Sequence, residues 1–181
     1  MSSADRLSPF SYVILTLVGR NGAGPHDLRR NAEQGRMYWD AAPSQWYAEP
    51  KRLAKLGYLE SEKLPGRTRE RTHYTLTDGG RAALEEWVRT PAAPPKTQNE
   101  GVVRLLAADL VPADATLEGL AALRPQVEEQ LAHLHAASAR WEETLPHRVH
   151  LLSVNARYAE GILRLQLEWL KEAEKTLRAQ G

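Results

Sequence analysis

The sequence predicts a mainly α-helical chain in two parts. Three helices, a β-hairpin and a fourth helix come first, and a long helical hairpin follows. Apolar residues recur every three or four positions through most of the chain, as in amphipathic helices. Two segments, 58–64 and 71–76, instead alternate as strands do. The proline-rich stretch 90–95 cannot continue a helix and separates the two parts.

The composition excludes several classes of protein. Hydrophobic residues make up 42% of the chain, with a single Phe, which suits a helical core. Because there is no Cys, a disulfide framework and thiolate metal sites are excluded. The longest apolar run, about 12–18, is far shorter than the ~20 residues that a bilayer requires. With no signal-peptide pattern at the start, we expect a cytoplasmic protein without a membrane partner.

Charge is distributed unevenly although the net charge is only +1. Residues 1–90 carry 14 Lys and Arg against 11 Asp and Glu. Within 51–71 there are seven basic residues and three acidic ones. A local basic cluster on an otherwise neutral protein is typical of a DNA-facing surface.

The first two helices have clear start and stop signals. Ser8 is a plausible N-cap and Pro9 suits the first turn. This helix should end before Asn21-Gly22, with an inward side formed by Tyr12, Leu15 and Val18. A second helix is expected at about 25–34, with Leu28 facing the core.

The third helix is expected within 44–57. Its apolar stripe is Trp46, Leu53 and Leu56, and Gly57 suits the C-terminal cap. Pro50 is unfavourable at this position, because a proline inside a helix removes a hydrogen bond and costs about 3 kcal/mol. Either the helix bends at Pro50 or its regular part starts there.

The two strands form a hairpin, with Pro65-Gly66 and several charges at its tip. Thr77-Asp78 then caps a fourth helix running to about Val88. Its inward side is predicted to hold Ala82 or Ala83, Leu84, and Trp87 or Val88. Three helices, a hairpin and a helix are the winged helix-turn-helix order, in which the third helix enters the DNA major groove.

The second half reads as a helical hairpin. After a short segment at 101–110, apolar residues recur by threes and fours over 114–145, where Pro146 ends the pattern, and again over 151–173. Two helices of about 30 residues would each span about 45 Å. Their exposed stripes need a partner, most simply a second copy of the chain. We therefore divide the chain into a DNA-binding domain (1–90), a linker with a short helix (91–113) and a helical dimerisation domain (114–181).

Several segments together resemble the PadR family of transcriptional regulators. They are 7–18, the stretch Tyr-Ala-Glu-Pro-Lys-Arg-Leu-Ala-Lys-Leu-Gly-Tyr-Leu at 47–59, Arg-Thr-His-Tyr-Thr-Leu-Thr-Asp-Gly-Gly-Arg at 71–81, and 99–106. The resemblance implies a bacterial repressor that dimerises through its C-terminal helices. It also implies release from DNA by a small aromatic or hydrophobic effector.

Candidate DNA contacts lie first on the third helix. Ser44 and Gln45 open it, where backbone amides and the helix dipole favour phosphate, and Gln45 could instead read an adenine. The alternative is that Ser44 only caps the helix. Tyr47 stands at the family's tyrosine and either reaches a phosphate or packs in the core. Three basic residues on this helix either contact DNA or form a solvated face: Lys51, Arg52 and Lys55.

The hairpin tip carries Arg67, Arg69 and Arg71 at alternating positions. Such arginines commonly contact phosphate or enter the minor groove. The alternative is that they keep an exposed strand edge from aggregating.

An effector pocket is predicted from Tyr38, Trp39 and Trp87, because flat ligands stack on such rings. Ordinary core or dimer packing of these rings is the alternative. No phosphate loop, nucleophile elbow or metal-ligand spacing is found, so we expect no enzyme activity, no cofactor and no metal. The alternative function is a helical protein-interaction module whose winged helix does not read DNA. Activation of transcription is a further alternative to repression, because the direction of regulation depends on where the operator lies relative to the promoter.

Overall fold

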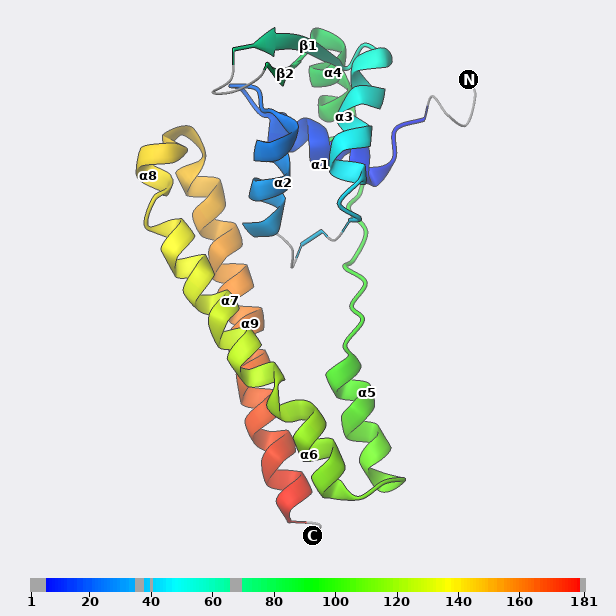
Figure 1. The fold of residues 1–181 in the computed structure, drawn as a ribbon, viewed down its shortest axis with the longest axis vertical. Coiled ribbons are helices and arrows are strands. Elements are labelled where there is room, and N and C mark those ends of the chain that lie inside the picture. The colour runs from blue at the N-terminus through cyan, green and yellow to red at the C-terminus, as the bar shows by residue number, and fades with distance from the viewer. Residues whose placement is uncertain (1–5, 35–37, 40, 66–69, 180–181) are drawn as a thin grey trace. The chain divides into compact units, whose positions relative to one another are not determined.

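The computed structural model describes residues 6–34, 38–39, 41–65 and 70–179. The chain divides into two compact units, Met1–Pro94 and Pro95–Gly181, and each is described by itself. The first unit contains helices and one β-hairpin, and the second consists of helices in its described part (Figure 1).

Three helices and a β-hairpin build the first unit, and a fourth helix completes it. Their bounds are α1 Pro9–Val18, α2 Pro25–Gln34, α3 Gln45–Lys55, β1 Leu59–Leu64, β2 Arg71–Leu76 and α4 Asp78–Val88. Burial brings together residues from most of these elements in one core: Ile14, Leu15, Val18, Leu28, Trp46, Leu53, Leu59 and Tyr74. The predicted winged-helix order is confirmed.

Local capping chemistry sets the start of α1 and α4. Ser8 and Ser11 form a reciprocal capping box at α1, with Pro9 in the first turn. Thr77 accepts a hydrogen bond from the Gly80 amide at 3.0 Å and so caps α4. Both N-caps are the residues that the sequence indicated.

The α3 helix runs through Pro50 instead of starting there. It begins at Gln45, and the Pro50 ring is buried against the core. Pro50 has no N–H to donate to the Trp46 carbonyl, so the backbone ladder of α3 lacks one bond at this point. Gly57 follows the helix at φ +81°, a left-handed conformation that suits glycine.

The wing is a two-stranded antiparallel sheet. Leu59 pairs with Leu76 at its base and Leu64 with Arg71 toward its tip. Reciprocal backbone hydrogen bonds of 2.9 and 3.0 Å join Ala23 to Tyr74 and tie the turn after α1 to β2. This bridge holds the base of the wing against the helices.

The second unit contains helices of unequal length in its described part. They are α5 Glu100–Leu106, η2 Ala107–Asp109, α6 Ala113–Ala121, α7 Leu123–Ser138, α8 Trp141–Thr144, η3 Pro146–Arg148 and α9 Val149–Arg178. The α7 and α9 helices pack side by side (Figure 1). The α6 helix packs on α9 around a core of Leu120, Leu170, Ala173 and Leu177.

The expectation of one helix of about 30 residues over 114–145 is wrong, whereas the second long helix is confirmed as the 30-residue α9. The first break follows Ala121. Pro125, four residues later, cannot donate to the Ala121 carbonyl, and its ring would clash there. The second break is a turn at Ala139 and Arg140, where the Arg140 amide bonds back to the Ala137 carbonyl.

Within the described parts of the chain, no helix is both long enough and apolar enough to span a bilayer.

Candidate nucleic-acid interface

The α3 helix has two opposite faces. Trp46, Pro50 and Leu53 are buried and hold the helix on the core. Residues three or four positions apart on the other side are exposed: Ser44, Tyr47, Ala48, Lys51 and Lys55. The buried stripe therefore fixes which side chains α3 presents outward.

At the start of α3, Gln45 and not Ser44 makes the local hydrogen bond. The Gln45 Oε1 accepts from the Ala42 amide at 3.0 Å. Ser44 has helical backbone angles and no side-chain capping bond. The alternative in which Ser44 simply caps α3 is therefore not what the structure has, and the exposed Ser44 hydroxyl stays available to a ligand.

Lys51 and Lys55 lie one turn apart on the exposed face, with Tyr47 one turn before Lys51. Neither lysine has an ion pair with another described residue. The Tyr47 side chain is 38% exposed, so it is not packed in the core. These three side chains form a contiguous surface that can donate hydrogen bonds to phosphate.

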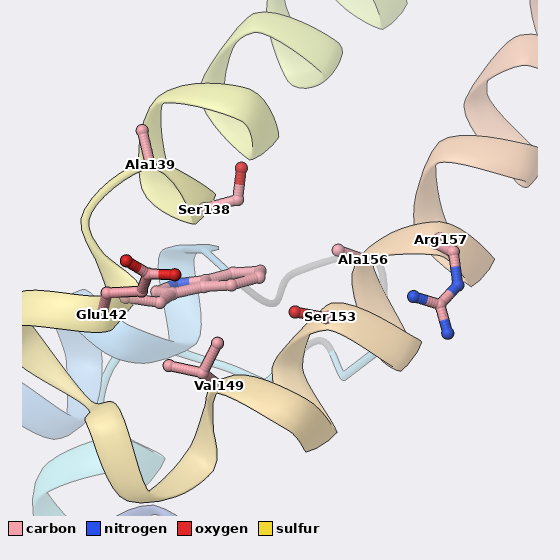
Figure 2. A pocket seen from close by; sticks show the side chains of 8 residues that line it. Ser138, Ala139, Glu142, Val149, Ser153, Ala156 and Arg157 are labelled. Carbon is pink, nitrogen blue, oxygen red and sulfur yellow. The ribbon is translucent and has the colours of Figure 1, made fainter.

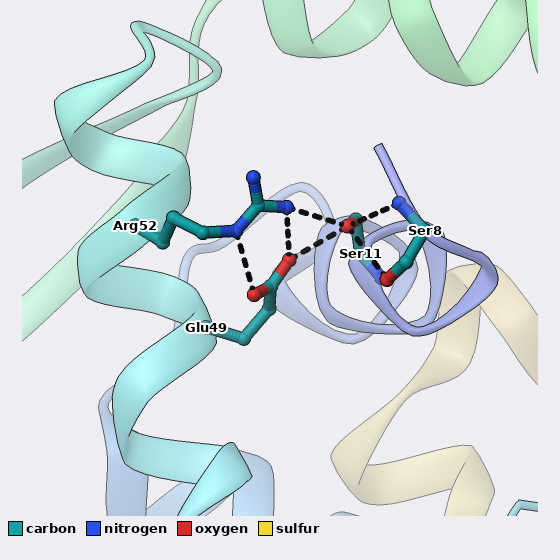
Figure 3. A network of polar contacts seen from close by, with 4 residues as sticks. All are labelled: Ser8, Ser11, Glu49 and Arg52. Carbon is teal, nitrogen blue, oxygen red and sulfur yellow. Dashed lines mark hydrogen bonds and ion pairs between the residues drawn. The ribbon is translucent and has the colours of Figure 1, made fainter. Parts of the chain in front are cut away.

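Arg52 lies elsewhere, toward α1. Its Nε donates to Glu49 Oε2 at 2.9 Å, and its Nη2 donates to Glu49 Oε1 at 2.7 Å and to Ser11 Oγ at 3.0 Å (Figure 3). The hydrogen bond from Arg52 lowers the pKa of Glu49 against the opposing effect of burial, and the Ser11 hydroxyl adds to the lowering. Of the basic residues predicted on α3, Arg52 is thus the one held by internal partners.

One of the three predicted wing arginines lies among the described residues. Arg67 and Arg69 lie outside the described residues. Arg71 is exposed at the start of β2. The strand register places Arg71 on the same face as Glu60 and Glu62, so carboxylates line part of that face.

Lys63 is a basic wing residue that was not singled out in the sequence. Its Nζ donates to Thr72 Oγ1 at 3.0 Å across the hairpin. The sequence feature that points to Lys63 is its place in the basic cluster 51–71.

The three aromatic residues predicted to line a pocket are each exposed by more than a third. Trp39 stacks on Phe10 with ring centroids 6.5 Å apart, and Trp87 stacks on Tyr12 at 4.8 Å. Both tryptophans therefore pack on rings of α1, while Tyr38 is 45% exposed.

A hollow lies in the second unit where α7, α8 and α9 meet (Figure 2). Glu142 and Arg157 lie on opposite sides of it, and neither has an ion pair with another described residue. Its remaining lining residues are Ser138, Ala139, Trp141, Val149, Ser153 and Ala156. Among the residues that the structure describes, no group of three or more His, Asp or Glu side chains could hold a metal ion.

Comparison with known proteins finds sequence similarity in the first unit. Residues 14–86 match the Transcriptional regulator PadR-like family. The chain is 29% identical over 96 residues to the Negative transcriptional regulator PadR of Bacillus subtilis (strain 168), a match that covers 51% of this chain and 53% of PadR. The chain therefore aligns with about half the length of that relative.

Solved structures resemble the chain over nearly its whole length. A PadR-like transcriptional regulator from Bacillus cereus has a TM-score of 0.82 at 16% identity, covering 97% of this chain and 99% of that one. Bacillus subtilis PadR in complex with operator DNA has a TM-score of 0.71 at 19% identity, covering 95% and 99%. The same protein in complex with p-coumaric acid has a TM-score of 0.62 at 21% identity, covering 94% and 97%. At these identities the likeness shows the fold.

Proposed function

We propose that the protein is a sequence-specific DNA-binding regulator, acting as a dimeric repressor, because residues 14–86 match the PadR-like family of transcriptional regulators. The observation that carries the proposal is the exposed face of α3, where Tyr47, Lys51 and Lys55 stand opposite the stripe that anchors the helix. Winged-helix proteins place this helix in the major groove. The operator complex of the related Bacillus subtilis PadR supports the same use.

In this proposal α3 and the wing contact different parts of the DNA. The start of α3, with Ser44 and Gln45, approaches a phosphate or a base edge, and the lysines neutralise backbone phosphates. The hairpin tip, with Arg67, Arg69 and Arg71, contacts the neighbouring backbone or minor groove. Residues 1–90 form the DNA-binding domain, 91–113 the linker with a short helix and 114–181 the dimerisation domain.

The proposed homodimer forms through the C-terminal helices. Four large apolar side chains between the start and the middle of α9 are each more than half exposed: Leu151, Val154, Tyr158 and Leu165. They are spaced by three, four and seven residues and so share one side of the helix. Covering such a stripe with the same stripe of a second copy removes the apolar surface from water.

The proposed effector is a small aromatic or hydrophobic compound, as the p-coumaric acid complex of Bacillus subtilis PadR supports. Its candidate site is formed by Tyr38, Trp39 and Trp87. Trp39 stacks on Phe10 and Trp87 on Tyr12, so a ligand at either tryptophan would add to an existing aromatic stack. Titrating planar aromatic acids while recording Trp fluorescence tests the site. An unchanged response in a Trp39→Leu, Trp87→Leu double variant would rule it out.

The alternative, a helical protein-interaction module, is favoured by a second exposed apolar surface, on α5 and just after η2. Val103, Leu106 and Leu110 are each more than 60% exposed there. On this reading the lysines of α3 are simply solvated.

Fluorescence anisotropy with DNA from upstream of the protein's own gene separates the two functions. Scrambled DNA of equal length is the control, and each duplex is measured at two salt concentrations. Tight binding that survives competitor and weakens steeply with salt supports the regulator. Equally weak binding to both duplexes, with no salt dependence, supports the interaction module. A DNA-binding regulator would act in the cytoplasm, and no cofactor enters the proposal.

A further inference from the structure

A buried polar network joins the beginning of α1 to the middle of α3. At its centre is Ser11, which is completely buried. The Ser11 hydroxyl donates to Glu49 Oε1 at 2.6 Å and accepts from the Ser8 amide at 2.9 Å and from Arg52 Nη2 at 3.0 Å (Figure 3). One side chain of α1 therefore contacts both polar partners on α3.

The α3 part of the network lies beside Pro50. Pro50 cannot donate to the Trp46 carbonyl, one turn earlier in the helix. Glu49 and Arg52 flank Pro50 in the sequence, and two hydrogen bonds between their side chains, of 2.7 and 2.9 Å, tie this turn together. The Glu49 side chain is only 14% exposed and the Arg52 side chain 32%, so solvent screens this pair less than an ordinary surface ion pair.

The network also restrains the rotation of α3 about its axis. The buried stripe of Trp46, Pro50 and Leu53 fixes which side of α3 faces the core, and hydrogen bonds to a buried hydroxyl add a directional restraint to that packing. With Glu49 and Arg52 held against α1, Lys51 lies on a different side of α3 and points outward.

We propose that Ser11, Glu49 and Arg52 are positioning residues, which hold α3 in the orientation that presents Tyr47, Lys51 and Lys55 to DNA. Arg52, in spite of its charge and its place on α3, does not itself contact a phosphate. This inference rests on the proposed DNA-binding function, and it deepens that function by separating the basic residue that supports the helix from those that touch DNA.

The direction in which one substitution changes the affinity for DNA distinguishes a positioning role from a purely electrostatic one. Glu49→Gln removes a negative charge from the recognition helix, so Coulomb attraction alone predicts tighter binding to DNA. Loss of positioning predicts weaker binding. We expect Glu49→Gln, Ser11→Ala and Arg52→Ala each to weaken binding about tenfold, as for the loss of a hydrogen bond to a charged group.

Salt dependence separates Arg52 from Lys51. Removing one phosphate contact lowers the slope of log affinity against log salt by about 0.9. We expect this change for Lys51→Ala and an unchanged slope for Arg52→Ala. Glu100→Gln and Arg104→Ala are the matched controls, because they break a similar ion pair of 2.6 Å in the second unit.

The experiment uses the full chain, the upstream duplex and its scrambled counterpart, well below the unfolding temperature of every variant. Tighter binding by Glu49→Gln, or a slope lowered by Arg52→Ala, would overturn the proposal. Hydrogen exchange of α3 gives a readout that needs no DNA, and we expect faster exchange in Ser11→Ala and Glu49→Gln. If the wild-type protein bound neither duplex, the proposed function would fail, and unchanged protection of α3 in both variants would overturn the positioning role separately.

Discussion

Tyr12 and Trp87 stack face to face, with ring centroids 4.8 Å apart and an angle of 6° between their planes. Tyr12 belongs to α1 and Trp87 to the last turn of α4, so the pair fastens the end of the first unit back onto its first helix. Trp87 is still 39% exposed, and its ring contributes through this contact more than through deep burial.

The first prediction concerns the strength of this stack. Aromatic pairs contribute about 0.5–1.5 kcal/mol beyond the area that they bury. We expect a double-mutant cycle of Tyr12→Leu and Trp87→Leu, followed by urea unfolding, to give a coupling free energy in that range. Trp39→Leu serves as the control, since Trp39 stacks on Phe10 instead and should show no coupling to Tyr12. Additive effects of the two substitutions would show that the stack contributes nothing.

Elements with local signals were predictable from the sequence. The α2 bounds, both strands and the Thr77 cap follow from capping residues, alternation and turn chemistry within a few positions. Pro125 is also a local signal for a helix break. The apolar residues on both sides of it keep the same helical spacing, so that spacing by itself predicts one helix across the break after Ala121.

The candidate site was predictable only in part. The outward direction of Lys51 and Lys55 follows from the helical period once Trp46 and Leu53 are placed inward. The role of Arg52 does not, because its partner Ser11 lies 41 positions earlier in the chain. Contacts of that length depend on how α1 and α3 pack, which no periodicity within α3 specifies.

The wing arginines give the second prediction. Replacing Arg67, Arg69 and Arg71 by Ala should weaken binding to operator and scrambled DNA alike, because phosphate contacts carry no sequence information. The salt slope should fall by up to about 0.9 for each phosphate that the wing no longer neutralises. The matched control removes three exposed arginines of the second unit, Arg140, Arg157 and Arg178. Normal affinity with an unchanged slope in the wing variant would show that the hairpin does not touch DNA.

Two adjacent glycines in α4 give the third prediction. A Cβ on Gly80 would lie 2.2 Å from the Tyr58 carbonyl oxygen, a backbone atom, whereas a Cβ on Gly79 would meet nothing closer than 3.6 Å. We expect Gly80→Ala to lower the free energy of unfolding by about 1–3 kcal/mol through overpacking. Gly79→Ala should be neutral or stabilising by up to about 1 kcal/mol, from helix propensity. Thermal and urea unfolding followed by circular dichroism measure both, and equal effects would contradict the close approach of α4 to Tyr58.

The proposed dimer gives the fourth prediction. Leu165 is 64% exposed on the apolar stripe of α9, and a carboxylate there would be buried without a partner in a dimer. We expect Leu165→Glu to shift the protein to a monomer in sedimentation velocity and to weaken operator binding. Lys171→Glu places a carboxylate on an exposed position of the same helix and should leave the dimer intact. A monomeric wild-type protein, or a dimer that tolerates Leu165→Glu, would show that the second copy does not cover this stripe.

The final prediction concerns the pH dependence of stability. The pKa of Glu49 is lowered in the folded chain, mainly by its hydrogen bond from Arg52. A carboxyl whose folded pKa lies below its unfolded pKa stabilises the fold at pH values above both, and this contribution is lost as the pH falls through the folded pKa. The unfolded pKa of Glu is about 4.3. The stability difference between wild type and Glu49→Gln should therefore be constant near neutral pH and shrink below about pH 4, as measured by urea unfolding across that range.

Glu60→Gln, at an exposed carboxylate of the wing, is the control. If the Glu49 difference persisted unchanged in acid, the pKa of Glu49 would be the same in the folded and the unfolded chain, and the Arg52 contact would not favour the ionised carboxylate.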